Sequence, residues 1–384
     1  MGQASAFPDP EPTAPFSTSG GSAASALLIG SCEPFSGKSA VVLGLGRQLL
    51  QRGVTVRFGK PLAAAADAAS GPEHGLIDAD VRFVGRCLGL PDDQLIPAVH
   101  GHGQARSRER LLAGELSAGA GFEALQQRLA ALPAGLTVLE AAGSLSEGLL
   151  YGLSLPQLAR GLRAPVVLVH PWSDCDSADA LLQAREQLGE LLAGVVLNSV
   201  LPEQVDALNA EVAPALERLG VPVLGVMPRS PLLRSVTVEE LARRLDAQVL
   251  CCRDRLDLLV ETLSIGAMNV NSAMEFFRRR RNMAVVTGAD RTDIQLAALE
   301  ASTQCLILTG VGDPLPQLIN RAEELEVPLL KVDHDTLTTV EVIESTFGHV
   351  RLQESVKATY AFRLVEEHCD FAPLFSRLCL PVPA

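Results

Sequence analysis

The sequence predicts an α/β protein in which a parallel-sheet domain is followed by a smaller α/β domain. Two observations lead to this fold class. From about residue 26 to residue 228, short apolar runs alternate with longer amphipathic stretches, which is typical of parallel strands joined by helical crossovers. After Pro228 a connector rich in Ser, Pro and Arg is followed by a second alternation of the same kind.

The first alternation contains six predicted strands, each a short apolar run bounded by turn residues. They are Ala26–Ile29, Val54–Phe58, Thr137–Glu140, Pro165–His170, Gly194–Asn198 and Val221–Val226. Helical periodicity between them predicts helices over Ser39–Gln51, Ala178–Leu192 and Pro202–Leu219.

The second alternation begins with a predicted helix over Thr237–Leu245. Strands are predicted at Thr262–Ala267, Ala284–Thr287, Cys305–Thr309 and Pro328–Val332. Helices are predicted at Ser272–Arg279, Ile294–Ser302, Pro314–Leu325, Thr336–Ser345 and near Glu354–Glu367. We therefore expect a disordered tail over 1–25, a first domain over 26–235, a second over 236–350, and a C-terminal helix and tail over 351–384.

Composition excludes several classes of protein. A net charge of −13 argues against a general nucleic-acid-binding surface, which would be basic. No apolar run approaches the ~20 residues needed to span a bilayer, and the N-terminus lacks the pattern of a secretory signal. The eight cysteines form no C-x-x-C pair and no metal-ligand spacing with histidines, and most lie in or beside apolar runs, which is typical of reduced, packed thiols, so we expect a cytoplasmic protein.

The loop that follows Ala26–Ile29 has the order of a phosphate site. Ser36-Gly37-Lys38-Ser39 opens a helix, where backbone N–H groups face an anion, a lysine adds charge and a hydroxyl can bind Mg2+. The pattern G-x-x-x-x-G-K-[ST] would place its first glycine at position 32, where this chain has Cys32. The alternative is a structural turn in which Lys38 is only solvated.

Three further polar residues end predicted strands of the first domain. Lys60 follows the second strand and Glu140 ends the third, and the carboxyl ends of parallel strands face one crevice. A carboxylate there can complete a magnesium site, and the amide of Asn198 suits a base edge. For each of them a solvated or turn-capping role is the alternative.

Together these segments resemble the dethiobiotin synthetase-like P-loop superfamily. The likeness is carried by Ser36-Gly-Lys-Ser39, Gly59-Lys60-Pro61, Glu140-Ala-Ala-Gly143, Asn198 and the run Val221-Pro-Val-Leu-Gly-Val-Met-Pro228. It is greatest to the N-terminal, non-transferase region of long phosphate acetyltransferases.

The resemblance implies a binding site for ATP and Mg2+. It assigns Ser36, Gly37, Lys38 and Ser39 to the phosphates, Ser39 and Glu140 to magnesium, and Asn198 to adenine. Lys38 and Lys60 are the residues that it places in catalysis, with Lys60 on a substrate anion. The Cys32–Phe35 segment departs from the Thr/Asp-rich loop of the synthetase, which puts a specific ligase reaction in doubt more than nucleotide binding.

The second domain resembles the DRTGG domain from about Val260 to Phe347. Asp290, Arg291 and Thr292 stand in the naming motif, whereas Asp293 and Ile294 replace its two glycines. Physically, Asp290 and Asp293 suit the N-cap and third position of a helix. A ligand-sensing role, which the resemblance implies, is the alternative.

Three functions remain open from the sequence. The first is an ATP-binding regulatory protein without phosphate acetyltransferase activity, since the transferase domain of that family is not expected within a chain that ends at Ala384. The second is an ATP-dependent carboxylate-activating ligase of the dethiobiotin synthetase or cobyrinate diamide synthase type, or a slow ATPase. The third is an assembly partner with a vestigial P-loop. We expect a nucleotide and a small-molecule effector as partners, no nucleic acid or membrane, and, from the resemblance, a homo-oligomer.

Overall fold

The computed structural model describes residues 26–63, 77–114, 116–266 and 269–380. The tail expected over 1–25 lies outside this part of the chain. The described residues form two compact units, one made of the chain up to Arg229 together with Leu352 onward, and the other of Ser230–Arg351. The segment expected to form a separate C-terminal helix and tail therefore belongs to the first unit.

A seven-stranded sheet is the centre of the first unit, and every neighbouring pair in it is parallel. Its strand order is β4-β2-β6-β1-β7-β8-β9. The strands are β1 (Ala26–Gly30), β2 (Val56–Gly59), β4 (Leu95–Ile96), β6 (Leu136–Glu140), β7 (Val166–Pro171), β8 (Leu192–Val200) and β9 (Val223–Pro228). The α/β fold class predicted from alternating apolar runs is thus confirmed, and the strand-end residues lie along one edge of the sheet.

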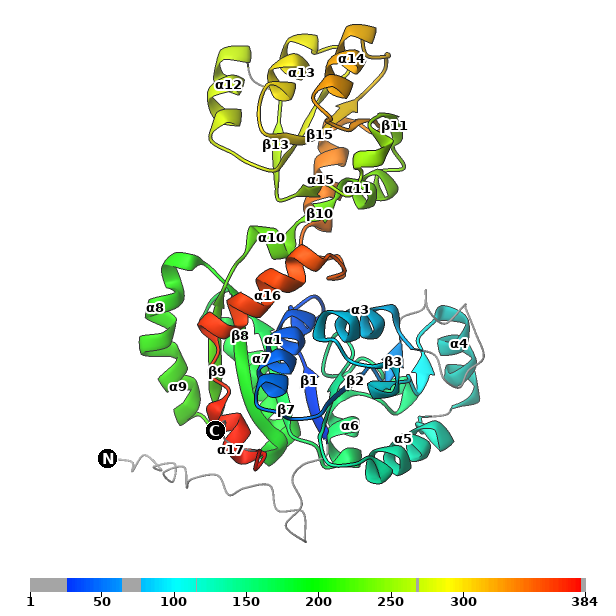
Figure 1. The fold of residues 1–384 in the computed structure, drawn as a ribbon, viewed down its shortest axis with the longest axis vertical. Coiled ribbons are helices and arrows are strands. Elements are labelled where there is room, and N and C mark those ends of the chain that lie inside the picture. The colour runs from blue at the N-terminus through cyan, green and yellow to red at the C-terminus, as the bar shows by residue number, and fades with distance from the viewer. Residues whose placement is uncertain (1–25, 64–76, 115, 267–268, 381–384) are drawn as a thin grey trace, which may run out of the picture. The chain divides into compact units, whose positions relative to one another are not determined.

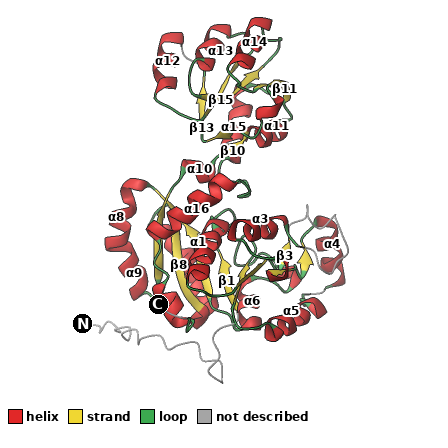
Figure 2. Ribbon diagram, in the orientation of Figure 1, coloured by secondary structure: helices red, strands yellow, loops and turns green. Residues whose placement is uncertain are grey.

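Helices cover both faces of this sheet (Figure 2). On one face α5 (Gly119–Ala131), α6 (Leu155–Leu162), α7 (Ala178–Leu188) and α9 (Ala213–Arg218) share one apolar core with the strands. On the other, α1 (Lys38–Gln51) packs on β1 and β6. The other α-helices among the described residues before 230 are α3 (Ala79–Leu88), α4 (Gln104–Ala113) and α8 (Val205–Ala207), and β3 (Leu62–Ala63) pairs with β5 (His100–Gly101).

Two predicted helices of the first unit are shorter or less regular than expected. Helix α7 ends at Leu188 because Gly189 has a positive φ of 56°, and a 3-10 turn then leads into β8 at Leu192. The stretch predicted as one helix over 202–219 contains a π-helical segment, Leu208–Val212, between α8 and α9. Pro214 lacks the N–H that an α-helix needs at that place, which accounts for the altered pitch before it.

The second unit is a smaller α/β domain, as predicted. Its five-stranded sheet has the order β11-β16-β15-β14-β13, with only the edge strand β11 antiparallel. The strands are β11 (Gln248–Cys251), β13 (Thr262–Ile265), β14 (Met283–Gly288), β15 (Thr303–Thr309) and β16 (Leu329–Lys331), beside a short pair β10 (Val236–Thr237) and β12 (Leu259–Val260).

Two apolar cores hold the helices of the second unit against its sheet. One contains α12 (Val270–Arg278), α13 (Thr292–Leu299) and α14 (Pro316–Glu324). The other contains α11 (Val238–Arg244) and α15 (Thr336–Thr346). The short helix α10 (Pro231–Arg234) precedes them in the chain. No helix among the described residues of either unit is long and apolar enough to cross a membrane.

The last helices return to the first unit, where α16 (Ser355–His368) lies beside α1 (Figure 1). Val365 is fully buried against Gly44, and the Arg47 guanidinium lies 5.0 Å from the Phe362 ring. Cys369 then pairs with Gly225 of β9 in an antiparallel bridge, before α17 (Ala372–Arg377). A cation over an aromatic ring and close helix packing both stabilise this docking.

We expect the substitution Gly44→Ala to destabilise the first unit, although alanine normally favours a helix interior by roughly 0.5–1 kcal/mol over glycine. A Cβ at Gly44 would lie 2.3 Å from Cβ of Val365, so α16 must move away from α1. The expected loss is about 1–3 kcal/mol in the free energy of unfolding, measured by urea titration. The double variant Gly44→Ala/Val365→Gly, which has no Cβ at position 365, should lose less than the sum of its single variants, and additive losses would contradict the packing argument.

Candidate nucleotide site

The loop between β1 and α1 is closed by a glycine that no other residue can replace without strain. Gly37 precedes the helix with a positive φ of 92°, a region in which side chains are disfavoured. A Cβ added to Gly37 would lie 2.3 Å from Nδ2 of Asn198. The same Nδ2 donates a hydrogen bond of 2.8 Å to the carbonyl of Ser36. The structure therefore brings Ser36, Gly37 and Asn198 together at the start of α1.

Lys38 is a buried cation at the first turn of α1. Lys38 is only 7% exposed, and its Nζ donates a hydrogen bond of 2.9 Å to Oγ of Ser31. Burial lowers the pKa of Lys38, against the raising effect of the Glu140 carboxylate. Ser31 in turn donates to the carbonyl of Gly143 at 2.7 Å. Burial disfavours the charged form of this lysine, and the negative charge of a bound phosphate group would stabilise it. Lys38 is therefore suited to bind a phosphate.

Glu140 joins the phosphate loop to the second strand. The parallel register pairs Ile29 of β1 with Glu140 of β6, so this carboxylate lies beside the loop. Oγ of Ser39 lies 3.2 Å and 3.3 Å from its two oxygens, and Nζ of Lys60 lies 3.3 Å from Oε1. The structure thus brings the buried Glu140 and the partly buried Ser39 and Lys60 into one cluster, whereas Asn198 contacts the loop at Ser36.

Asp80 is a member of this cluster that the sequence reasoning missed. Its Oδ2 lies 2.6 Å from Nζ of Lys60, and its backbone N–H donates to Oδ1 of Asp78, the N-cap of α3. Burial by itself lowers the pKa of Lys60, but the carboxylates of Glu140, Asp80 and Asp78 together raise it well above its ordinary value. The available signal was the pair of acidic residues in Ile77-Asp-Ala-Asp80, directly before an apolar helical pattern.

The residues present fit a bound Mg-nucleotide. Oγ of Ser36 is buried and has no hydrogen-bond partner among the described residues, which is a cost that an anion at the loop would remove. Ser39 and Glu140 supply the hydroxyl and carboxylate that Mg2+ accepts beside phosphate oxygens. No group of three or more His, Cys, Asp or Glu side chains in the described ranges could hold a metal ion without such a ligand.

Cys32, which stands at the first glycine position of the P-loop pattern, is partly buried and unreactive. Burial, with a smaller effect of Glu33, raises the pKa of the Cys32 thiol to about 12, and Sγ lies 3.5 Å from the carbonyl of Ala180. A thiol with that pKa remains protonated and is a poor nucleophile. Phe35 has a positive φ of 56° and its side chain is exposed. Where a glycine was expected, Cys32 therefore places a protonated thiol that donates a hydrogen bond to the carbonyl of Ala180.

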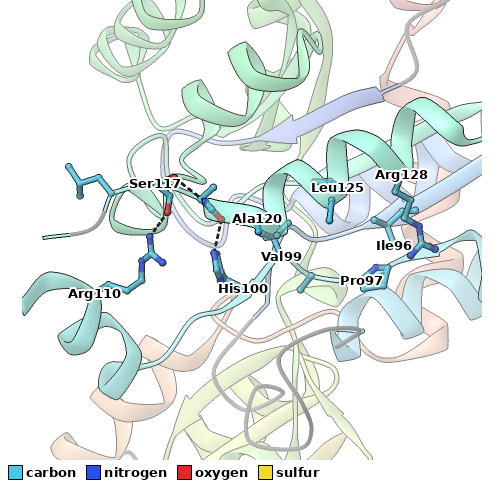
Figure 3. A pocket seen from close by; sticks show the side chains of 15 residues that line it. Ile96, Pro97, Val99, His100, Arg110, Ser117, Ala120, Leu125 and Arg128 are labelled. Atoms are coloured by element: carbon cyan, nitrogen blue, oxygen red, sulfur yellow. Dashed lines mark hydrogen bonds between the residues drawn. The ribbon is translucent and has the colours of Figure 1, made fainter. Parts of the chain in front are cut away.

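A large, mainly apolar pocket lies beside the strand that follows α3. Its volume is about 910 Å3, within the range of small-molecule sites. Figure 3 shows Arg110 and His100 near Ser117 at one end, Arg128 over Ile96 and Pro97 at the other, and Val99, Ala120 and Leu125 between them.

The pocket-lining segment from Ile96 to Val99 is hydrogen-bonded to the backbone before and after Lys60. Ile96 pairs with Gly59 in the sheet, and the N–H of Val99 donates a hydrogen bond of 2.8 Å to the carbonyl of Pro61. A ligand in the pocket would therefore lie against the backbone that positions Lys60.

The DRTGG motif residues form the turn between β14 and α13 in the second unit. The N-cap of α13 is Arg291, and no side chain caps it. The prediction that Asp290 caps this helix is therefore wrong. Nε of Arg291 instead lies 3.4 Å from Oδ1 of Asp293, at an exposed position. Such a pair contributes little stability. The carbonyl of Gly288 accepts hydrogen bonds from the N–H of Arg291 at 3.1 Å and from Nε2 of Gln295 at 2.8 Å, and these close the turn.

The parallel sheet, the Gly-Lys-Ser loop and the buried lysine define a P-loop ATP-binding domain. Residues 25–237 match the family model of an AAA domain, which is more than half of the chain, and residues 240–346 match that of the DRTGG domain. The chain therefore belongs to this AAA-domain family of P-loop proteins and carries a DRTGG domain after it.

Two kinds of curated relatives match different lengths of the chain. A phosphate acetyltransferase of Nitratidesulfovibrio vulgaris is 25% identical over 92% of this chain and 51% of its own length. One of Deinococcus radiodurans is 27% identical over 90% of this chain and 50% of its own length. The ATP-dependent dethiobiotin synthetase BioD of Pseudomonas aeruginosa is 35% identical over 56% of this chain and 92% of its own length. The chain thus spans about half of these acetyltransferases and nearly all of the synthetase.

We expect Lys60→Met to lower the free energy of unfolding at pH 7 by about 3–5 kcal/mol, because two buried carboxylates lose their common cation. Because the pKa of Lys60 is raised in the folded protein, its contribution is complete below about pH 10 and is lost as the pH rises through the folded pKa, so the loss caused by Lys60→Met should begin to shrink above pH 10. Urea titrations from pH 7 to pH 11 measure this, with Lys60→Arg as the charge-retaining control. A loss that stays the same at pH 11 would contradict the ionic origin.

Proposed function

We propose that this protein is an ATP-binding regulatory protein of the kind found as the N-terminal region of long phosphate acetyltransferases, and that it does not itself transfer acetyl groups. The observation that carries the proposal is the grouping of the buried Lys38 and Glu140 with the partly buried Ser39 at the loop, where the Ser36 hydroxyl has no partner among the described residues. In it Lys38 would offset phosphate charge, and Ser39 with Glu140 would hold Mg2+.

Asn198 is suited to the adenine. Its Nδ2 is engaged by the Ser36 carbonyl, whereas its Oδ1 accepts no hydrogen bond from the described residues. An amide oxygen can accept the amino group of adenine, and guanine presents an acceptor at the equivalent place. We therefore expect a preference for ATP over GTP.

The regulatory role is supported by the state of Lys60. The resemblance gives a substrate anion to this lysine, yet here its ammonium is paired with Asp80 and lies 3.3 Å from Glu140. A substrate anion would have to displace a buried carboxylate, which is unfavourable. Binding without turnover is thus the simpler function, and the DRTGG domain would be the place at which a small-molecule effector acts. We further propose a cytoplasmic homo-oligomer, in keeping with the eight free cysteines.

The second candidate function is an ATP-dependent carboxylate-activating ligase. Two observations favour it, namely the match over 92% of a dethiobiotin synthetase and the pocket next to the backbone of Lys60. The exposed Arg128 could bind an anionic group of a mainly apolar acceptor there. This function requires Lys60 to leave Asp80 when the acceptor binds. The third candidate is an assembly partner in which the P-loop binds nothing.

Titration calorimetry of ATP with and without Mg2+ separates these functions. We expect saturable binding by the wild type, at least about tenfold weaker binding by Lys38→Ala, and no change in Lys331→Ala, which removes a lysine of the second unit. Absence of binding by the wild type would leave only the assembly partner.

Phosphate release then distinguishes the two ATP-binding functions. We expect release from ATP to stay at background with a panel of mono- and dicarboxylates as acceptors. Release that depends on one acceptor, and that is lost in Lys60→Met, would instead establish the ligase.

A further inference from the structure

The chain that returns from the second unit makes direct contact with the ion cluster of the nucleotide site. The first unit resumes at Leu352, and the next residue is Gln353. Its Nε2 donates a hydrogen bond of 3.2 Å to Oδ1 of Asp80. The other carboxylate oxygen, Oδ2, holds Lys60 at 2.6 Å. Both carboxylate oxygens of Asp80 therefore have a partner. One is paired with Lys60, and the other accepts from the side-chain amide of Gln353, 273 positions away in sequence.

Gln353 is held in place by the helix that follows it. The backbone N–H of Gln353 donates to Oε2 of Glu354 at 3.3 Å, and the same oxygen lies 3.0 Å from Nζ of Lys357. The Lys357 side chain is completely buried, so this ion pair is shielded from solvent on the lysine side. Because α16 then packs along α1, the position of Gln353 is fixed relative to the phosphate-loop helix.

We propose that Gln353 is a positioning residue of the nucleotide site, which holds the Asp80 carboxylate against Lys60 and so sets how far Glu140 is free to bind a metal ion. The ammonium of Lys60 lies between the carboxylates of Asp80 and Glu140. If one carboxylate moves away, the ammonium shifts toward the other. If Asp80 turns away, Lys60 pairs more closely with Glu140 and competes with Mg2+ for that oxygen. The inference rests on the proposed function for its consequence, but the contact itself can be tested without nucleotide.

The first experiment measures the reactivity of the Lys60 amine. The intact protein is labelled with a trace amount of N-hydroxysuccinimidyl acetate. The rate of acetylation at Lys60 is then divided by the rate of acetylation at Lys331 in the same sample. We expect Gln353→Ala to raise this ratio about three- to tenfold, because the hydrogen bond that holds Asp80 in place is lost and the Lys60 ammonium is then stabilised by Glu140 alone instead of by two carboxylates. Ser355→Ala, two residues further at an exposed position of α16, is the matched control and should leave the ratio unchanged. Equal ratios in the two variants would overturn the proposal.

A double-variant cycle shows whether the effect passes through Asp80. In the Asp80→Asn background, Gln353→Ala should cause no further change in the labelling ratio. An undiminished effect there would mean that Gln353 acts through the packing of α16, and the proposal would be wrong.

The second experiment relates the contact to nucleotide binding. We expect Gln353→Ala to reduce the Mg2+-dependent gain in ATP affinity several-fold, and to change affinity without Mg2+ much less. If the wild type binds no ATP, the proposed function fails, while the labelling ratio still decides the role of Gln353. If the wild type binds ATP and Gln353→Ala keeps the full Mg2+-dependent gain, the role of Gln353 in the site fails and the proposed function stands.

Discussion

The nucleotide domain depends on one buried ammonium, that of Lys60, held between two carboxylates. A lone charge in the interior costs several kcal/mol, so Lys60, Asp80 and Glu140 can be buried only together. Each of them comes from a different element of the sheet edge: the end of β2, the start of α3 and the end of β6. The cluster therefore fixes the relative positions of three connections, and through Ser39 it also fixes the start of α1.

The same arrangement gives Lys38 and Lys60 different capacities to bind an anion. Lys38 is desolvated and, among the described residues, its ammonium is hydrogen-bonded only to the neutral Ser31, so it is available to an anion. Lys60 is already neutralised. Lys38 and Lys60 have similar sequence contexts, since each follows a strand and comes directly after a glycine. They nevertheless differ in what they can bind, because their neighbouring side chains differ.

Much of this could be predicted from the sequence, because strand ends and parallel pairing are local signals. The alternating pattern predicted the sheet, and the glycine-lysine-serine loop predicted which end of it would gather Lys38, Ser39, Lys60 and Glu140. Asp80 and Gln353 could not be predicted in the same way. Asp80 enters from a helix start rather than a strand end, and Gln353 follows a whole second unit in the chain. Its contact is set by tertiary packing, which leaves no periodicity in sequence. The prediction that Asp290 caps α13 was wrong for a related reason. The N-cap position is set by the backbone angles of the turn and not by the presence of an aspartate nearby.

The docking of α16 on α1 has a consequence for how the protein is made. Translation delivers the phosphate-loop helix early, but the helix that covers it only after the second unit has been synthesised. Until then the surface around Gly44 that receives Val365 remains uncovered on the ribosome. Domains usually fold as units during synthesis, N-terminal part first. Here the first unit must wait for its last helix, so the nascent chain presents an apolar surface for the time needed to synthesise more than a hundred residues, which is when chaperone binding would matter most.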